Sequence, residues 1–116
     1  NPPIHAGGLR HHGKAPVISY LIYNKLMRAV AYHQNEVFEA ARTFAQTEGV
    51  IVAPETAHSI KCVIDEAMKC RKTGEKKVIT FALTGHGLLD LVAYDQFLDG
   101  ELVDWEPTTI EVPKYI

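Results

Sequence analysis

Apolar runs and stretches of helical periodicity alternate along this chain. Two short apolar runs, at 50–53 and 77–83, are rich in β-branched or aromatic residues, and residues 28–32 alternate between large and small side chains. Such runs are typical of strands, and a wholly apolar run suits a strand buried on both faces of a sheet. Apolar residues recur every three or four positions between the runs, which predicts helices. Strands alternating with helices predict an α/β fold with a parallel sheet.

Start and stop signals place the helices. Pro16 suits the first turn of a helix with an apolar stripe reaching Leu26, since its missing amide costs nothing there. The stripe predicts packing on a core. Asn35 is expected to cap a second helix, which ends at Gly49. The other two helices are expected over residues 54–73 and 88–98.

Composition changes this picture little. The 116 residues suit one domain, and 47% hydrophobic with 22% charged residues is ordinary for a globular protein. The net charge of -2 gives no reason to expect nucleic acid or an anionic membrane as partner. No apolar run approaches the roughly 20 residues that cross a bilayer, so the cytoplasm is the expected location.

Cysteine spacing also favours a reducing compartment. Cys62 and Cys70 fall on one predicted helix, roughly 12 Å apart along its axis, which is beyond the reach of a disulfide. The spacing fits no zinc pattern. Both are expected to be free thiols.

The first fifteen residues read as an irregular loop rich in proline and glycine. The chain begins with Asn1 rather than methionine, and so long a lead suggests a fragment of a larger protein. His5, His11 and His12 lie in this loop without a carboxylate or cysteine. A solvated or cofactor-facing loop is therefore favoured over a metal site.

The turn at 84–87 is the first candidate site. It follows the apolar run 77–83, and ligands bind at the carboxyl ends of strands in open α/β sheets. Gly85 and Gly87 permit close approach to the backbone and leave the hydroxyl of Thr84 at the tip. An ordinary strand-to-helix connection explains the residues equally well.

Two further places carry candidate chemistry. Glu48 lies in the last turn of a predicted helix, where a carboxylate meets the negative end of the helix dipole. A functional interpretation would use it as a charge near a ligand. Glu55 and His58 share one helical face, although such a pair is more often a cap and a surface hydrogen bond.

Three motifs, taken in order, resemble a known family. They are Ile4-His-Ala-Gly-Gly-Leu-Arg10, Thr47-Glu-Gly-Val-Ile-Val-Ala-Pro-Glu-Thr-Ala-His58, and Thr84-Gly-His-Gly87 followed by Asp90. Together they resemble the C-terminal part of tryptophan synthase β chains, most closely the second, β-like class. The resemblance spans nearly the whole chain and is weakest over the last dozen residues.

The resemblance implies a fold-type II enzyme that uses pyridoxal 5'-phosphate to condense L-serine with indole. It implies a homodimer, with residues 1–116 forming the C-terminal portion of the large cofactor-binding domain. A monovalent cation and a tryptophan synthase α subunit are further candidates that the family suggests. The alternatives are another fold-type II enzyme, related to cysteine or threonine synthases, and a non-catalytic α/β ligand-binding module.

The resemblance also implies roles for particular residues. By this likeness the hydroxyl of Thr84 would hydrogen-bond the pyridine nitrogen. The family more often has serine at this position. The backbone lining the pyridine edge would come from Gly85, His86 and Gly87. Glu48 matches a glutamate that assists charge and proton handling beside the ring. A mobile segment near the substrate would comprise Gly7, Gly8, Leu9 and Arg10.

The chain departs from the family in ways that limit these expectations. Arg10 stands where the first class has an aspartate, so contacts that close the loop there cannot be carried over. Val52 replaces a proline, and Leu88-Leu89 replaces a His-Phe pair. The chain also has no His-Lys pair for the Schiff base and no Gly-Gly-Gly-Ser-Asn run for the phosphate. We therefore expect no catalysis from these residues alone.

Overall fold

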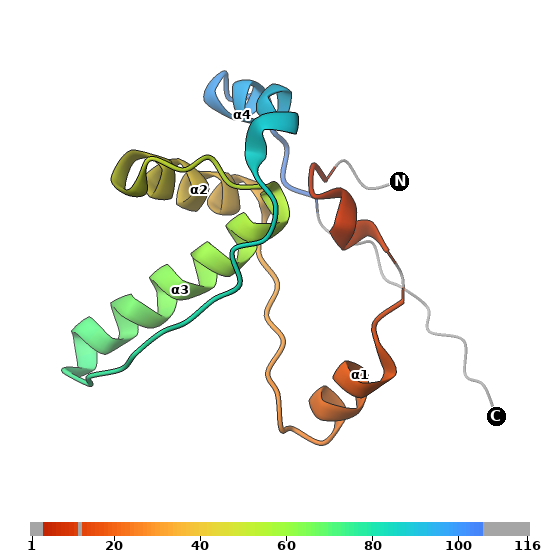
Figure 1. The fold of residues 1–116 in the computed structure, drawn as a ribbon, viewed down its shortest axis with the longest axis vertical. Helices are drawn as coiled ribbons and strands as arrows, with labels where there is room; N and C mark the ends of the chain where they lie inside the picture. Colours follow the sequence, from red (N-terminus) through yellow and green to blue (C-terminus); the bar gives the residue numbers. More distant parts are fainter. Residues whose placement is uncertain (1–3, 12, 106–116) are drawn as a thin grey trace.

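The computed structural model describes residues 4–11 and 13–105. Its elements are the 3-10 helix η1 (Gly7–Arg10), helices α1 (Pro16–Tyr23), α2 (Gln34–Glu48) and α3 (Pro54–Thr73), the 3-10 helix η2 (Gly87–Leu89) and helix α4 (Leu91–Leu98). Helices α2, α3 and α4 form the body of the molecule, and α1 lies apart from them (Figure 1). No helix in these ranges combines the length and apolar character that a membrane span needs.

Helix α2 begins with a different cap from the one expected. The N-cap is His33, whose amide donates to Glu36 Oε1 at 3.0 Å. The prediction that Asn35 is the cap is wrong, because Asn35 lies inside the first turn. Its side chain instead donates to the Leu102 carbonyl at 3.0 Å and so ties the segment after α4 to α2.

The C-terminal ends of α2 and α3 follow the sequence signals. Gly49 and Gly74 adopt left-handed conformations, with φ of 70° and 74°, directly after the last helical residues. Their amides donate to the carbonyls of Ala45 and Cys70, at 3.0 and 2.8 Å. Both predicted stops are confirmed. Cys70 is also a free thiol, as expected.

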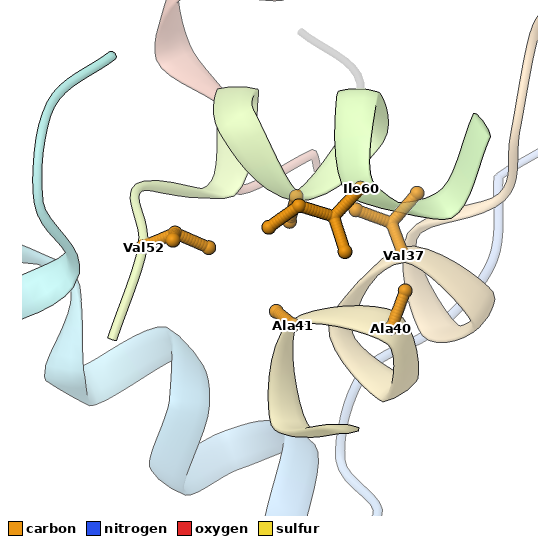
Figure 2. Packing of buried hydrophobic residues seen from close by; sticks show 6 residues of the cluster. Val37, Ala40, Ala41, Val52 and Ile60 are labelled. Carbon is orange, nitrogen blue, oxygen red and sulfur yellow. The ribbon is translucent and has the colours of Figure 1, made fainter. Parts of the chain in front are cut away.

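The core lies between α2 and α3. Small side chains on both helices let the two backbones approach closely, and Val52 closes the end of the interface (Figure 2). The buried members of this cluster are Val37, Ala40, Ala41, Val52, Ala57 and Ile60. Phe38 extends the core toward α4, where its ring meets Tyr94 edge-on with centroids 5.0 Å apart.

Helix α1 does not pack as its apolar stripe predicts. It ends at Tyr23, and none of its residues is buried. Val17, expected in a core, is 60% exposed. The periodicity correctly predicted a helix here, but the packing prediction is wrong for the described residues.

The helices of the predicted α/β fold are present, but the predicted parallel sheet is not seen in the described residues, whose regular secondary structure is helical. Residues 28–32, 50–53 and 77–83 form no strand, and Val78 is 94% exposed. The amide of Gly87 donates to the Ile51 carbonyl at 2.9 Å, an isolated bond rather than a ladder. β-Branched and aromatic residues fit the pleated, buried surface of a sheet. A strand forms, however, only when a neighbouring strand hydrogen-bonds to its backbone amides and carbonyls.

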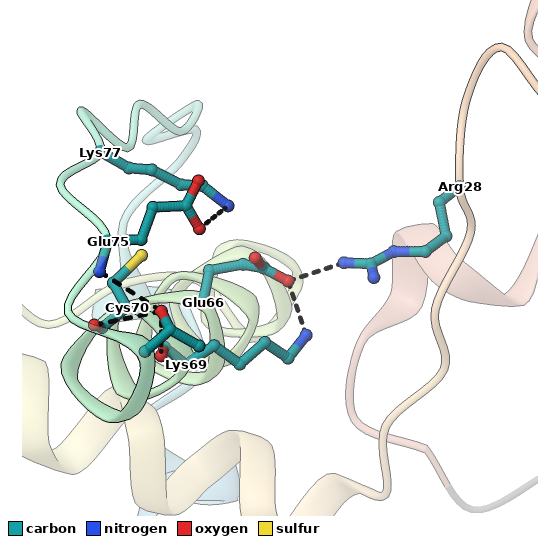
Figure 3. Close-up of polar contacts among 7 residues, drawn as sticks. Arg28, Glu66, Lys69, Cys70, Glu75 and Lys77 are labelled. Carbon is teal, nitrogen blue, oxygen red and sulfur yellow. Dashed lines mark hydrogen bonds and ion pairs between the residues drawn. The ribbon is translucent and has the colours of Figure 1, made fainter.

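One ion pair ties the long connection between α1 and α2 to α3, and a second pair within α3 shares the same carboxylate. Arg28 Nη2 and Lys69 Nζ each lie 2.7 Å from Glu66 Oε1 (Figure 3). Hydrogen bonds from Lys69 and Arg28 lower the pKa of Glu66 to about 2. The side chains of Arg28 and Lys69 are exposed and that of Glu66 is half-buried, so the Arg28 pair orients the connection more than it stabilises the fold.

Candidate functional site

The first turn of α3 holds both of the loops that the sequence singles out. Glu55 Oε1 accepts a hydrogen bond of 2.7 Å from the amide of Gly8, in the 7–10 loop. The next residue, Thr56, contacts Thr84, in the 84–87 turn. Two consecutive side chains therefore join segments that lie 47 and 28 residues away in the sequence.

Thr56 is 1% exposed and makes three polar contacts with Thr84. Its hydroxyl donates to the Thr84 carbonyl, and the Thr84 amide donates back to Thr56 Oγ1 at 3.3 Å. The two hydroxyl oxygens lie 3.2 Å apart. The sequence analysis missed Thr56, because its partner is distant in sequence and nothing local marks the residue.

The 84–87 turn is also fastened to the segment before α3. Gly85 has a φ of 66°, which favours glycine. A Cβ on Gly87 would clash with the Val52 carbonyl oxygen and lie 2.6 Å from Ile51 Cγ2. Glycine is therefore needed at position 87 because the chain's own backbone passes so closely.

Tyr94 supports the same segment from α4. Its hydroxyl donates to the Val52 carbonyl at 2.6 Å, and its ring lies beside Gly87. Burial of the ring, with the nearby Asp90 charge, raises the pKa of Tyr94 to about 12. The hydroxyl therefore stays a hydrogen-bond donor across the physiological range.

The exposed face of the turn carries the groups that could meet a ligand. Thr84, Gly85 and His86 are exposed, whereas Gly87 is buried. His86 Nδ1 accepts a hydrogen bond of 3.2 Å from the Leu88 amide, which fixes the ring against η2. The 84–87 turn thus exposes polar groups and a glycine to solvent, while contacts on its buried side hold its backbone in place.

The 7–10 loop is a single turn of 3-10 helix, closed by the Leu9 amide on the Ala6 carbonyl at 3.1 Å. Gly7, Gly8, Leu9 and Arg10 are all exposed. A Cβ on Gly8 would lie 3.2 Å from Glu55 Cγ. The side chain of Glu55 is therefore the surface on which this loop rests.

A cavity of about 330 Å³ lies beside the loop. Leu9, Tyr32, His58 and Trp105 are among its lining residues. His58 Nδ1 is 2.8 Å from the Pro54 carbonyl, which only accepts, so this nitrogen carries the hydrogen. Glu55 and His58, noted as a pair in the sequence, thus have different partners.

Glu48 is not brought to this junction in the described part of the chain. It is the last residue of α2 and is exposed. Figure 1 shows that end of α2 apart from the first turn of α3. Its catalytic role stays a prediction.

Residues able to hold a metal ion do not cluster within 4–11 and 13–105. No group of three or more histidine, cysteine, aspartate or glutamate side chains is placed to bind one. His12 lies outside the described residues.

The described fold is a helical unit in which the first turn of α3 joins the 84–87 turn to the 7–10 loop. No family model matches the chain. It is 61% identical over 106 residues to the tryptophan synthase β chain of Thermococcus onnurineus, covering 91% of this chain and 24% of that protein. It is 63% identical over 102 residues to β chain 2 of Aquifex aeolicus, covering 88% of this chain and 24% of that protein.

A third relative is β chain 2 of Pyrococcus abyssi, 56% identical over 111 residues, with 96% of this chain and 25% of that protein covered. The chain spans about a quarter of the length of the curated relatives it matches. It is therefore homologous to a C-terminal part of tryptophan synthase β chains. The resemblance drawn from the three motifs is confirmed.

Proposed function

We propose that this chain is the C-terminal part of a pyridoxal-phosphate-dependent enzyme of the tryptophan synthase β-like class, which condenses L-serine with indole. The identity to β chains over about nine-tenths of the chain carries the proposal. The described geometry supports it, since the 84–87 turn and the 7–10 loop, which the family places at cofactor and substrate, meet at one helix turn.

Thr84 fits the proposed cofactor by its chemistry. Thr84 is an exposed residue whose hydroxyl can bond a heteroaromatic ring nitrogen, and Gly85 beside it has no side chain to obstruct a flat ring. Pyridoxal phosphate, when bound, supplies an electron sink for replacement at the β-carbon of an amino acid. A neutral hydroxyl does not force protonation of the ring nitrogen, which moderates that sink. The exposed residues Gly85 and His86 would line the ring edge, with the buried Gly87 holding the turn behind them.

Two other groups complete the share of the site that this chain supplies. Glu48 would hold charge and move a proton beside the ring. The 7–10 loop would border the substrate, and the contact of Gly8 with Glu55 would keep it closed over the site. A closed loop excludes water and orients the substrate.

The proposal assigns the remaining groups to parts of the enzyme outside these residues. The Schiff-base lysine and the phosphate-binding loop belong to the motifs that this chain lacks. A homodimer, a monovalent cation, an α subunit and a cytoplasmic location are also part of the proposal. Exposed apolar side chains such as Val78 and Leu89 fit a segment that is covered by further protein.

The test uses the complete polypeptide that contains this chain, purified from its source. We expect a mass well over twice that of this chain, bound pyridoxal phosphate, and consumption of indole with serine. Use of O-acetylserine or phosphohomoserine without indole would show a different enzyme of the same fold type. A native mass equal to that of this chain would contradict the proposal.

Thr84→Val is the variant that links the activity to this segment. It removes the hydroxyl and nearly keeps the shape, so we expect about tenfold weaker cofactor binding, the worth of one good hydrogen bond. Thr84→Ser, which restores the residue more usual in the family, should bind as the wild type does.

A further inference from the structure

Thr56 is a buried polar residue to which the proposed function gives no role. A threonine at 1% exposure must satisfy its hydroxyl inside the protein or pay for its desolvation. Here every described partner of that hydroxyl belongs to one residue, Thr84. Thr56 therefore holds one particular residue rather than filling space in the core.

The three contacts together fix the position of Thr84. The carbonyl and the amide of Thr84 are bound on either side of its Cα by the same oxygen of Thr56. The Thr84 hydroxyl oxygen lies 3.2 Å from Thr56 Oγ1, and this contact limits rotation of the Thr84 side chain about χ1. Because the Thr56 proton is donated to the Thr84 carbonyl, the Thr84 hydroxyl keeps its own proton for another acceptor. Backbone and hydroxyl are thereby placed as one unit.

The support behind Thr56 is rigid. The residue lies in the first turn of α3, between the buried residues Pro54 and Ala57. Ala57 belongs to the core shared with α2. A group held by such an element is placed more accurately than one held by another loop.

We propose that Thr56 is a positioning residue that sets the hydroxyl of Thr84 for the ring nitrogen of the cofactor. This inference rests on the proposed function, because it concerns the same site. Thr56 acts on the cofactor through the Thr84 side chain and does not touch the cofactor itself. Its removal should therefore matter only while the Thr84 hydroxyl is present.

A double-mutant cycle in the complete polypeptide tests this dependence. Thr56→Val keeps the shape and removes the hydroxyl, and we expect about tenfold weaker binding of pyridoxal phosphate. In the Thr84→Val background the same substitution should change the dissociation constant by less than about twofold. Thr56→Ser should restore wild-type binding. If Thr56→Val does not fold, Thr56→Cys, whose thiol is a weak donor, takes its place.

The absorption spectrum of the bound cofactor gives a second readout. The midpoint of its pH dependence should shift in Thr56→Val and return in Thr56→Ser, because the bond at the ring nitrogen changes. A purely structural role would lower the melting temperature without moving that midpoint.

Two results would overturn the inference while leaving the proposed function intact. One is an unchanged dissociation constant and spectrum in Thr56→Val. The other is an equal loss of affinity in both Thr84 backgrounds. A wild-type protein that binds no pyridoxal phosphate would instead overturn the proposed function itself.

Discussion

The two loops that meet at the first turn of α3 are held very differently. The 84–87 turn is bound from several sides, by Thr56, by the Ile51 carbonyl and by packing against Tyr94. The 7–10 loop rests on α3 through one described side-chain contact, from the Gly8 amide to Glu55. The first region is fixed at many points, whereas the second has one described hydrogen bond to α3.

This difference suits the tasks proposed for the two regions. A cofactor site needs groups that stay in place through every turnover, and buried, multiply bonded groups do so. A loop beside the substrate must open and close, and such loops are drawn from segments of low local stability. An exposed hydrogen bond competes with water and contributes only about 0.5–1.5 kcal/mol.

The largest effect is expected from Gly87→Ala. The added Cβ would clash with the Val52 carbonyl oxygen, a backbone atom that cannot move cheaply, so we expect a loss of about 3 kcal/mol in the free energy of unfolding. Gly13→Ala is the control, since a Cβ there meets no atom within 4 Å. Denaturant unfolding of the complete polypeptide measures both. Equal stability of the two variants would show that the turn is not tightly packed.

Tyr94→Phe should have an intermediate effect on the same region. It removes the bond to the Val52 carbonyl, and we expect a loss of about 1 kcal/mol in the free energy of unfolding at neutral pH. If this variant kept wild-type stability and wild-type cofactor affinity, the Tyr94 hydroxyl would not be supporting the 84–87 turn.

The raised pKa of Tyr94 adds a dependence on pH. The pKa of Tyr94 is about 12 in the folded protein and 10.0 for an ordinary tyrosine, so the unfolded chain releases the proton first. The stabilisation from this group is complete below pH 10 and is lost as the pH rises through about 12. Unfolding of wild type and Tyr94→Phe, compared at several pH values in this window, should show a steeper decline in wild type.

Glu55→Ala should have the smallest effect on global stability, below about 1 kcal/mol, because it breaks one exposed hydrogen bond. Its local effect should be clear, since the 7–10 loop loses its described tether to α3. Trypsin cleavage after Arg10 in the complete polypeptide should become faster. Glu55→Gln keeps an acceptor oxygen and should be cleaved at nearly the wild-type rate. Equal cleavage of all three proteins would show that Glu55 does not hold the loop.

Local signals in the sequence predicted the local structure well. The stops of α2 and α3 follow from Gly49 and Gly74. The glycine that takes the left-handed conformation after a helix is itself visible in the sequence, so no distant partner is needed to predict it. The 84–87 turn and the 7–10 loop were recognised from their glycines and motifs. Glu55 was noted, but as a surface residue rather than as the anchor of a loop.

Features that depend on distant partners were beyond the sequence. The contact of Thr56 with Thr84 spans 28 residues and leaves no periodic trace. The sheet was predicted from apolar runs whose strand partners are not among the described residues. The close approach of the Val52 backbone to Gly87 was likewise not predicted, because Val52 lies far from Gly87 in the sequence.

Amide hydrogen exchange in the complete polypeptide tests the contrast between the two loops most directly. The Gly87 amide, bonded to Ile51 and buried, should exchange at least about tenfold more slowly than the exposed Gly8 amide, a difference of about 1.4 kcal/mol in opening free energy. Glu55→Ala should speed exchange at Gly8 and leave Gly87 unchanged. Equal protection at the two amides in the wild type, or a joint release of both in Glu55→Ala, would contradict the account.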